Sequence, residues 1–220
     1  MLRNWMLLGL LASASFGMLL FAEEGGFTPL FDGKTLEGWE QQSDLFRVEG
    51  EGADAAIVAG SLEKSIPRNE FLVSEKEYGD FELRLEAKLE GKGQNAGIQF
   101  RSQRVPNHHE VTGYQCDAGI LDGKSIWGAL YDESRRNCFL AHDAEVCAKA
   151  TQEGWNQVVI RCEGPRIQIW VNGVRTVDYT ETDDQVPRTG KIALQIHGGE
   201  PALASYRGIR IKDLSDDAAN

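Results

Sequence analysis

The chain has 220 residues, of which 41% are hydrophobic and 26% are charged, a composition typical of one soluble globular domain with a full core. Its formal net charge of -11 argues against nucleic acid or an anionic membrane surface as a partner, because both need clustered Lys and Arg. The same acidity is compatible with a neutral ligand such as a sugar, and with simple solubility.

The N-terminus is predicted to be a signal peptide over residues 1–22. Arg3 precedes an uncharged apolar run from Trp5 to Phe21, and small and then acidic residues follow. We place cleavage after Ala22, with cleavage after Ala14 as the alternative. An uncleaved membrane anchor ranks second, because small residues interrupt the run. The mature protein is therefore expected to be periplasmic or secreted, with no membrane attachment.

Alternation of apolar and polar residues with period two predicts half-buried strands along most of the remaining chain. Phe81–Glu90 is the clearest case, with five apolar residues on one face and only Glu, Arg and Lys on the other. Arg166–Tyr179 is predicted to be a hairpin, because Asn172-Gly173 supplies the two positive-φ residues of a type I′ turn. Further strands are expected over 155–162, 191–198 and 206–214, and one short helix over 143–151. This pattern predicts a single all-β sandwich domain over 27–214, followed by a short disordered tail at 215–220.

Three of the predicted strands present unusual polar side chains on the face away from the core. These side chains are Gln99, Arg101, Gln115, Asp117, Gln195 and His197. Amides and Arg suit hydrogen bonds to sugar hydroxyls, and Asp and His exchange protons near neutral pH. We expect them to line one concave sheet face. The alternative is a set of scattered surface residues on strands that are not neighbours.

The segment Lys124–Asn137 holds a second group of candidate residues. It contains the aromatic residues Trp127 and Tyr131 and the charged residues Asp132, Glu133, Arg135 and Arg136. Aromatic faces stack on sugar rings, and paired carboxylates are typical of glycoside hydrolysis. Adjacent carboxylates in a strand point to opposite faces, however, so both cannot serve one site directly. The alternative for the two arginines is a surface loop held by ion pairs.

The four cysteines allow three complete disulfide pairings in an exported protein. Cys138 and Cys147 flank one short segment, and we predict a disulfide between them. Cys116 and Cys162 lie in strand-like runs and either form a pair or are buried as small hydrophobic residues.

The sequence does not assign any metal ligands. The run His108-His109-Glu110 lies in a Pro-containing loop, where adjacent histidines are more often simply exposed. The short segment 121–125 contains an Asp that suits calcium, which is weak support for a site.

Seven segments together resemble the 3-keto-disaccharide hydrolase domain family. In chain order they are FTPLFDGKTLEGWE, GDFELRLEAKL, NAGIQFRS, GYQCDAG, WGALYDESRR, WNQVVIRCEGPRIQIWVNGV and ALQIHGG with YRGIRIKDL. The resemblance covers Phe27–Leu214. It implies a concanavalin A-like jelly-roll β-sandwich of two antiparallel sheets, in exported proteins that act on glycosides oxidised to a ketone at C3. Cys116 and the insert with Cys138 and Cys147 depart from the family's usual pattern.

The implied reaction is removal of the acidic C2 proton, loss of the aglycone from C1, and addition of water to the enone. Under this resemblance His197 or Asp117 is the expected base, Glu133 or Asp132 assists the leaving group, and Arg101 or a divalent metal, calcium included, holds the enolate. The expected sugar-positioning residues are Gln99, Gln115, Gln195, Trp127, Tyr131 and Arg135. The alternative functions are a non-catalytic, lectin-like carbohydrate-binding module and a structural domain of the cell envelope.

Overall fold

The computed structural model describes residues 25–40, 42–93 and 95–215. The predicted signal peptide lies outside these residues, as does the predicted tail apart from Ser215. Among the described residues, no helix has the length and apolar character needed to span a membrane.

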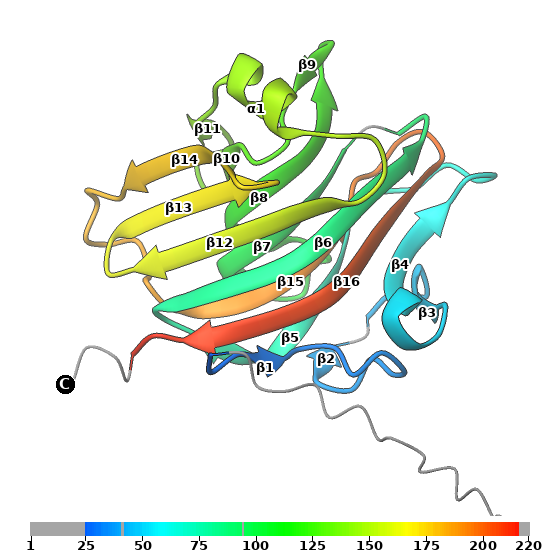
Figure 1. Ribbon diagram of the computed structural model, residues 1–220, viewed down its shortest axis with the longest axis horizontal. Coiled ribbons are helices and arrows are strands. Elements are labelled where there is room, and N and C mark those ends of the chain that lie inside the picture. The colour runs from blue at the N-terminus through cyan, green and yellow to red at the C-terminus, as the bar shows by residue number, and fades with distance from the viewer. Residues whose placement is uncertain (1–24, 41, 94, 216–220) are drawn as a thin grey trace, which may run out of the picture.

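Two antiparallel sheets make up the molecule (Figure 1). Sheet A runs from edge to edge as β14 (Val174–Thr180), β13 (Arg166–Val171), β12 (Asn156–Glu163), β6 (Phe81–Gly91), β16 (Ala202–Asp213), β4 (Ala56–Ser61) and β3 (Phe46–Glu49), with β1 (Thr28–Pro29) beside β16. Sheet B runs as β11 (Phe139–Ala141), β10 (Leu130–Glu133), β8 (Val111–Leu121), β7 (Asn95–Arg104), β15 (Gly190–Ile196), β5 (Glu70–Tyr78) and β2 (Trp39–Glu40), with β9 (Lys124–Ser125) beside β8. The helical segments are η1 (Gly52–Asp54) and α1 (Ala144–Ala150). The predicted all-β sandwich is therefore confirmed.

Local signals in the sequence placed several elements correctly. The β13–β14 hairpin turns at Asn172 and Gly173, whose φ angles are +48° and +80°. The short helix α1 is capped by Asp143, whose carboxylate accepts hydrogen bonds from the backbone N–H groups of Glu145 and Val146. The hairpin was predicted from its turn residues, because a type I′ turn depends on neighbours in the chain, and the helix was expected over 143–151 without its cap.

The core lies between the two sheets and is built from the inward half of each alternating strand. Phe81 of sheet A meets Phe100 of sheet B edge to face at 6.3 Å, and Phe100 stacks on Tyr114 at 5.7 Å between ring centroids. All three rings are almost fully buried. Burial of this kind stabilises by about 1.5–3 kcal/mol for each large apolar side chain.

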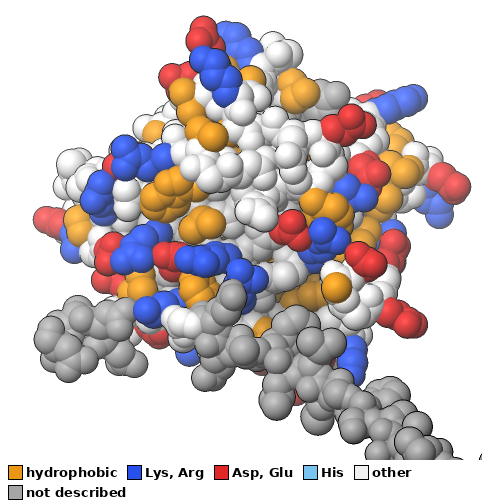
Figure 2. Space-filling view, in the orientation of Figure 1, with side chains coloured by type: hydrophobic (Ala, Val, Ile, Leu, Met, Phe, Trp, Pro, Cys, Tyr) orange, Lys and Arg blue, Asp and Glu red, His pale blue; other side chains and the backbone are white. Residues whose placement is uncertain are grey.

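The outer face of sheet A carries the charged residues that the alternation in Phe81–Glu90 predicted. Figure 2 shows Lys and Arg interspersed with Asp and Glu on the side of the molecule that sheet A presents. Arg207 contacts Glu86 at 2.7 Å and lies over the Trp155 ring at 4.2 Å. Paired charges of this kind form a solvated surface, so sheet B is the better candidate for the functional site.

Candidate functional site

Three neighbouring strands at the centre of sheet B bring the predicted amides together. Gln115 of β8 is the Cα partner of Gln99 in β7 and of Tyr131 in β10. The next row runs from Gln195 in β15 through Gly97 to Asp117. The expectation that these strands share one face is confirmed, and the alternative of strands that are not neighbours is wrong. We call the outward-facing residues of this region the polar face: Gln99, Gln115, Asp117, Tyr131, Glu133 and Gln195.

Hydrogen bonds join the polar face into two short chains. Gln99 Nε2 donates to Gln115 Oε1 at 3.1 Å, and Gln115 Nε2 donates to Asp117 Oδ1 at 2.6 Å. Gln195 Nε2 donates to Glu133 Oε2 at 3.4 Å. The three amides and Asp117 are at most 3% exposed, whereas Tyr131 and Glu133 are partly exposed. The polar face therefore opens to solvent on the β10 side.

Three buried amide oxygens near this face have no hydrogen-bond partner among the described residues. They are Asn95 Oδ1, Gln99 Oε1 and Gln195 Oε1. A buried polar atom without a partner costs about 1–3 kcal/mol, so native proteins rarely keep one without a reason. Acceptors of this kind suit the O–H groups of a ligand. Asn95 begins β7 and was missed in the sequence, although the alternation of β7 gives it the parity of Gln99.

The two carboxyl groups of the polar face hold protons unusually tightly. Burial, together with the charge of Glu133, raises the pKa of Asp117 to about 8, although the hydrogen bond from Gln115 lowers it. Burial and the charge of Glu110 raise the pKa of Glu133 to about 7. The pKa of the Tyr131 hydroxyl is also raised, by burial and then by the charges of Glu133 and Asp117. The polar face therefore carries two carboxyl groups whose raised pKa values bring their titration near neutral pH.

Glu110 and Ser134 belong to the surroundings of Glu133 and were not among the predicted site residues. Ser134 Oγ donates to Glu110 Oε2 at 3.4 Å, from the turn that follows Glu133. In the sequence, Glu110 stands out only as a possible metal ligand next to His108 and His109. Glu110 comes near Glu133 because the β7–β8 connection folds back over the sheet. The sequence does not reveal this fold.

Asp132 points into the sandwich, opposite to Glu133, as adjacent residues of a strand must, and Arg135 reaches it from the turn after β10. The Asp132 side chain is fully buried and accepts hydrogen bonds from Arg135 Nε at 2.8 and 3.0 Å and from Arg136 Nε. The Arg135 guanidinium lies over the Tyr114 ring at 4.6 Å. The expected placement of Asp132 and Arg135 beside the sugar is therefore wrong, and the ion-pair alternative for both arginines is correct.

Arg101 does not join the polar face either. A bulge in β7 between Phe100 and Gln103 shifts the register, and Arg101 adopts φ +47°. Its side chain is 1% exposed and contacts Asp80 at 2.9 Å, and it donates to the carbonyls of Gly79 and Gly164 at 3.0 and 2.8 Å. The bulge reverses the alternation on which the prediction rested, so the Arg101 side chain does not lie on the polar face. It links the turn at Gly79 to the turn at Gly164.

Trp127 and His197 also lie away from their expected positions. Trp127 is 7% exposed and packs in the main hydrophobic core, so it does not offer a ring face to a ligand. His197 follows the last residue of β15 and is exposed, with Nδ1 at 2.6 Å from the carbonyl oxygen of its neighbour Gly198. Among the described residues, no hydrogen bond or ion pair connects His197 to the polar face.

The predicted Cys138–Cys147 disulfide is not formed, because all four cysteines are free thiols. Cys138 is exposed in the turn before β11, whereas Cys147 lies on the buried side of α1 against Ile126 and Ala129. The helix turns the Cys147 side chain toward the interior, whereas Cys138 is exposed to solvent, so the two side chains do not face each other. Cys116 and Cys162 are buried as small apolar residues, one of the two alternatives.

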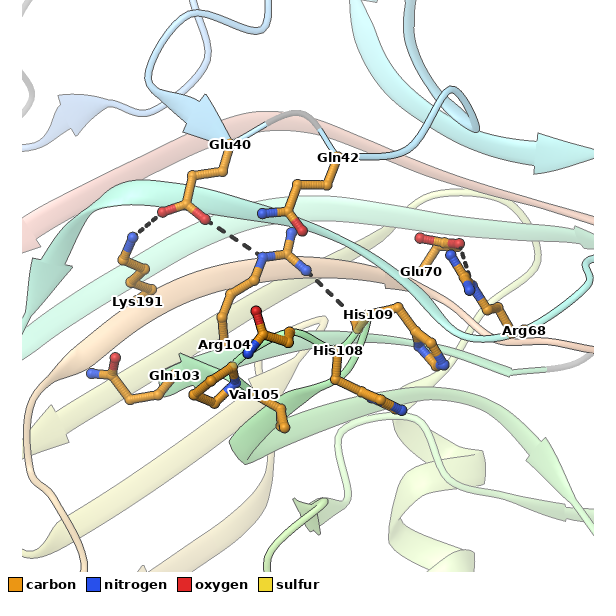
Figure 3. Close-up of a pocket in the computed structure, with 12 residues that line it drawn as sticks. Glu40, Gln42, Arg68, Glu70, Gln103, Arg104, Val105, His108, His109 and Lys191 are labelled. Carbon is orange, nitrogen blue, oxygen red and sulfur yellow. Dashed lines mark hydrogen bonds and ion pairs between the residues drawn. The ribbon is translucent and has the colours of Figure 1, made fainter.

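A wide groove of about 950 Å³ lies on sheet B (Figure 3). Lys191 and Arg104 both reach Glu40 there, and Arg68 contacts Glu70 at 2.9 Å. Glu40 stands in the same row of Cα partners as Gln99, which follows through Val73 and Ala193. The groove and the polar face therefore lie on the same face of sheet B.

The histidine pair His108 and His109 lines this groove, with stacked rings 4.3 Å apart. Across the described part of the chain, no cluster of three or more His, Cys, Asp or Glu side chains has the arrangement of a metal site.

Comparison with known proteins identifies the family. The profile of the 3-keto-alpha-glucoside-1,2-lyase-like domain matches residues 26–212. The chain belongs to this family. Family membership supports a carbohydrate-related function of a glycoside hydrolase-like kind. No curated protein matches the chain.

Solved structures share the fold of this 3-keto-alpha-glucoside-1,2-lyase-like domain. A candidate glycosyl hydrolase from Parabacteroides distasonis matches with a TM-score of 0.61 and 21% identity, over 86% of this chain and 94% of its own. A carbohydrate-binding module from Bacillus subtilis gives 0.57 and 14%, over 80% and 96%. The β-glucanase of Bacillus licheniformis gives 0.51 and 15%, over 86% and 99%. The fold is therefore a concanavalin A-like jelly-roll β-sandwich.

Proposed function

We propose that the protein cleaves 3-keto-glycosides, including 3-keto-disaccharides, outside the cytoplasm, in the periplasm or after secretion. The observation that carries this proposal is that two carboxyl groups with raised pKa values, Asp117 and Glu133, lie on one amide-lined face. Enzymes keep such groups where protons must move near neutral pH. The groove on the same face of sheet B supplies a polar surface for the remainder of the sugar substrate.

Glu133 is the better base and Asp117 the better acid. With a pKa of about 7, Glu133 is substantially ionised at neutral pH and accepts the C2 proton of the substrate. With a pKa of about 8, Asp117 is mostly protonated and donates to the leaving oxygen as the C1–O bond breaks and C1=C2 forms. The sequence suggested the opposite roles, because it does not report the deeper burial of Asp117.

Hydration then restores both groups. Water adds its oxygen to C1, its released proton returns to Asp117, and protonated Glu133 returns a proton to C2. The net change is hydrolysis of the glycosidic bond, with all atoms balanced. The Tyr131 hydroxyl, on the same polar face, is the proposed neutral donor to the developing negative charge on the C3 oxygen.

A divalent metal, calcium included, is not used in these steps. Around Asp117 and Glu133, no group of three or more His, Cys, Asp or Glu side chains among the described residues has the arrangement of a metal site. Metal dependence is addressed directly by the experiment below.

The test is release of the aglycone from 3-keto-trehalose or a 3-keto-glucoside by the purified mature protein, with EDTA or with added divalent metal. We expect turnover by the wild type, and losses of about 100-fold or more in Glu133→Gln and Asp117→Asn. The exposed Glu63→Gln variant is the matched control and should keep full activity. Wild-type-like activity in both site variants would contradict the assignment, and loss with EDTA would establish a metal requirement.

The unpaired amide oxygens support a second candidate, a non-catalytic carbohydrate-binding module. They accept hydrogen bonds from sugar hydroxyls whether or not a reaction follows. This alternative predicts sugar binding by calorimetry with no turnover of any 3-keto-glycoside. It also predicts that Gln99→Ala weakens binding, whereas Glu133→Gln changes it little.

A further inference from the structure

The strand that carries Tyr131 and Glu133 has little backbone support of its own. β10 has four residues and pairs with β8 on one side and with the three-residue β11 on the other. The β10–β11 register shifts between Leu130 and Tyr131. A short strand near the edge of a sheet opens more readily than a central one, because fewer buried contacts hold it. Accurate placement of Glu133 therefore needs support from side chains.

That support is found on the opposite face of β10. Asp132 accepts hydrogen bonds from Arg135 and Arg136, which the following turn brings back toward the strand. The Asn137 N–H donates to the Asp132 carbonyl at 2.8 Å, and the Ser134 N–H donates to Asn137 Oδ1 at 3.0 Å. Ser134 and Asn137 both have φ +52°, which permits the tight return. The turn thus closes on the residue that lies next to Glu133.

Arg136 extends this arrangement to sheet A. Its Nη2 contacts Glu181 Oε2 at 2.5 Å, and Glu181 follows the end of β14. The Tyr114 hydroxyl, from β8, donates to the same oxygen at 2.7 Å. Glu181 is 6% exposed and Asp132 is fully buried. The chain of contacts therefore joins β10, β8 and the end of β14 through the interior.

The network holds equal numbers of acidic and basic side chains. Two carboxylates, Asp132 and Glu181, face two guanidinium groups, Arg135 and Arg136. Burial opposes ionisation of Glu181, but hydrogen bonds from Arg136, the Asp183 N–H and Tyr114 lower its pKa to about 2. Removal of one member leaves a buried charge without its partner, which is strongly unfavourable.

We propose that Asp132, Arg136, Glu181 and Tyr114 are positioning residues for Glu133, holding β10 so that the Glu133 carboxyl stays over the polar face beside Gln195. None of the four touches the substrate in this scheme. The inference rests on the proposed function, in which Glu133 is the base. A displacement of about 1 Å at a reacting group costs up to about 100-fold in rate, so loosening β10 should be measurable.

The test compares Arg136→Met and Arg136→Lys with a matched control, Glu82→Gln, which breaks ion pairs with Arg84 and Arg161 on sheet A. We expect Arg136→Met to lower kcat by about 10- to 100-fold with KM changed by less than about 2-fold. Arg136→Lys should recover part of kcat, because an ion pair can re-form. Glu82→Gln should affect stability only.

The pH profile separates positioning from a merely structural role. Glu133 is faced by Asp117 from β8, Glu110 from the β7–β8 connection, Gln195 from β15 and Tyr131 from its own strand. Loosening β10 hydrates Glu133, so the acid limb of kcat/KM should move to lower pH in Arg136→Met and not in Glu82→Gln. An unchanged kcat and acid limb in folded Arg136→Met would overturn the proposal.

Tyr114→Phe serves if Arg136→Met fails to fold, because it removes one hydroxyl and keeps the stacked ring. It should shift kcat and the acid limb in the same direction by a smaller amount, about 3-fold in kcat. If the wild type shows no turnover, the proposed function fails, and the positioning of Glu133 is then read by NMR titration of its carboxyl group. A Glu133 pKa unchanged by Tyr114→Phe would reject the network in that case.

Discussion

Glu133 and Asp132 are adjacent in the chain and do different work because a strand turns successive side chains to opposite faces. Glu133 joins Asp117 on the polar face, where burial and like charge raise the pKa of both groups. Asp132 is fully buried among arginines on the other face. The alternation alone predicted this division. The identity of the partners on each face was not predictable, because they come from distant segments such as Glu110 and Glu181.

The two raised pKa values predict a narrow bell-shaped dependence of kcat/KM on pH. The rate should rise as Glu133 ionises near pH 7 and fall as Asp117 loses its proton near pH 8, the two values belonging to the pair. Steady-state rates between pH 5 and 10 check this. In Glu110→Gln the loss of a neighbouring negative charge should lower the pKa of Glu133 and move the acid limb to lower pH. A rate that is constant from pH 5 to pH 7 would contradict the role of Glu133.

At the scale of elements, the β7 bulge decides what Arg101 does. The extra residue in the strand sends the Arg101 side chain to two backbone carbonyls and to Asp80, at the turns that precede β6 and join β12 to β13. The alternation of GIQFRS could not reveal this, because a bulge depends on the pairing of two strands and leaves no fixed signature in one of them.

Arg101→Ala should therefore lower stability more than activity. Removing the buried guanidinium leaves the Gly79 and Gly164 carbonyls without this donor and Asp80 without its ion pair, a loss of about 3 kcal/mol in the free energy of unfolding. Urea unfolding measures it, with Arg47→Ala as the control because that side chain is 42% exposed. If folded Arg101→Ala lost turnover while its stability stayed at the wild-type level, the catalytic role expected from the sequence would be restored.

At the scale of the whole molecule, the site lowers the free energy of unfolding above neutral pH. The folded state holds protons on Asp117 and Glu133 that the unfolded chain has already released at pH 5 to 7, since the ordinary values are 3.8 and 4.5. The stability that these groups contribute is fully present below about pH 4 and is lost as pH rises through about 7 and 8. Glu181 acts oppositely, but only below about pH 4.5.

We therefore expect thermal unfolding to occur at a lower temperature at pH 8.5 than at pH 5.5, by about 5 °C or more. The double variant Asp117→Asn with Glu133→Gln should show a smaller difference, because its amides do not titrate. Calorimetry at the two pH values checks this, with Glu63→Gln as the control. An equal difference in the wild type and the double variant would show that the two carboxyl groups do not govern the effect.

Local sequence patterns predicted the strands, the Asn172-Gly173 turn and a short helix over 143–151, and they placed Gln99, Gln115, Asp117 and Gln195 on the faces of their strands that point away from the core. These features follow from dihedral preferences and period-two alternation, which are properties of neighbouring residues. The pairing of strands in the folded chain places Glu133 on the same face as Asp117, Trp127 in the core, and Cys138 apart from Cys147. Such outcomes depend on which strands pair and on what each side chain is buried against, and those contacts join residues far apart in the chain.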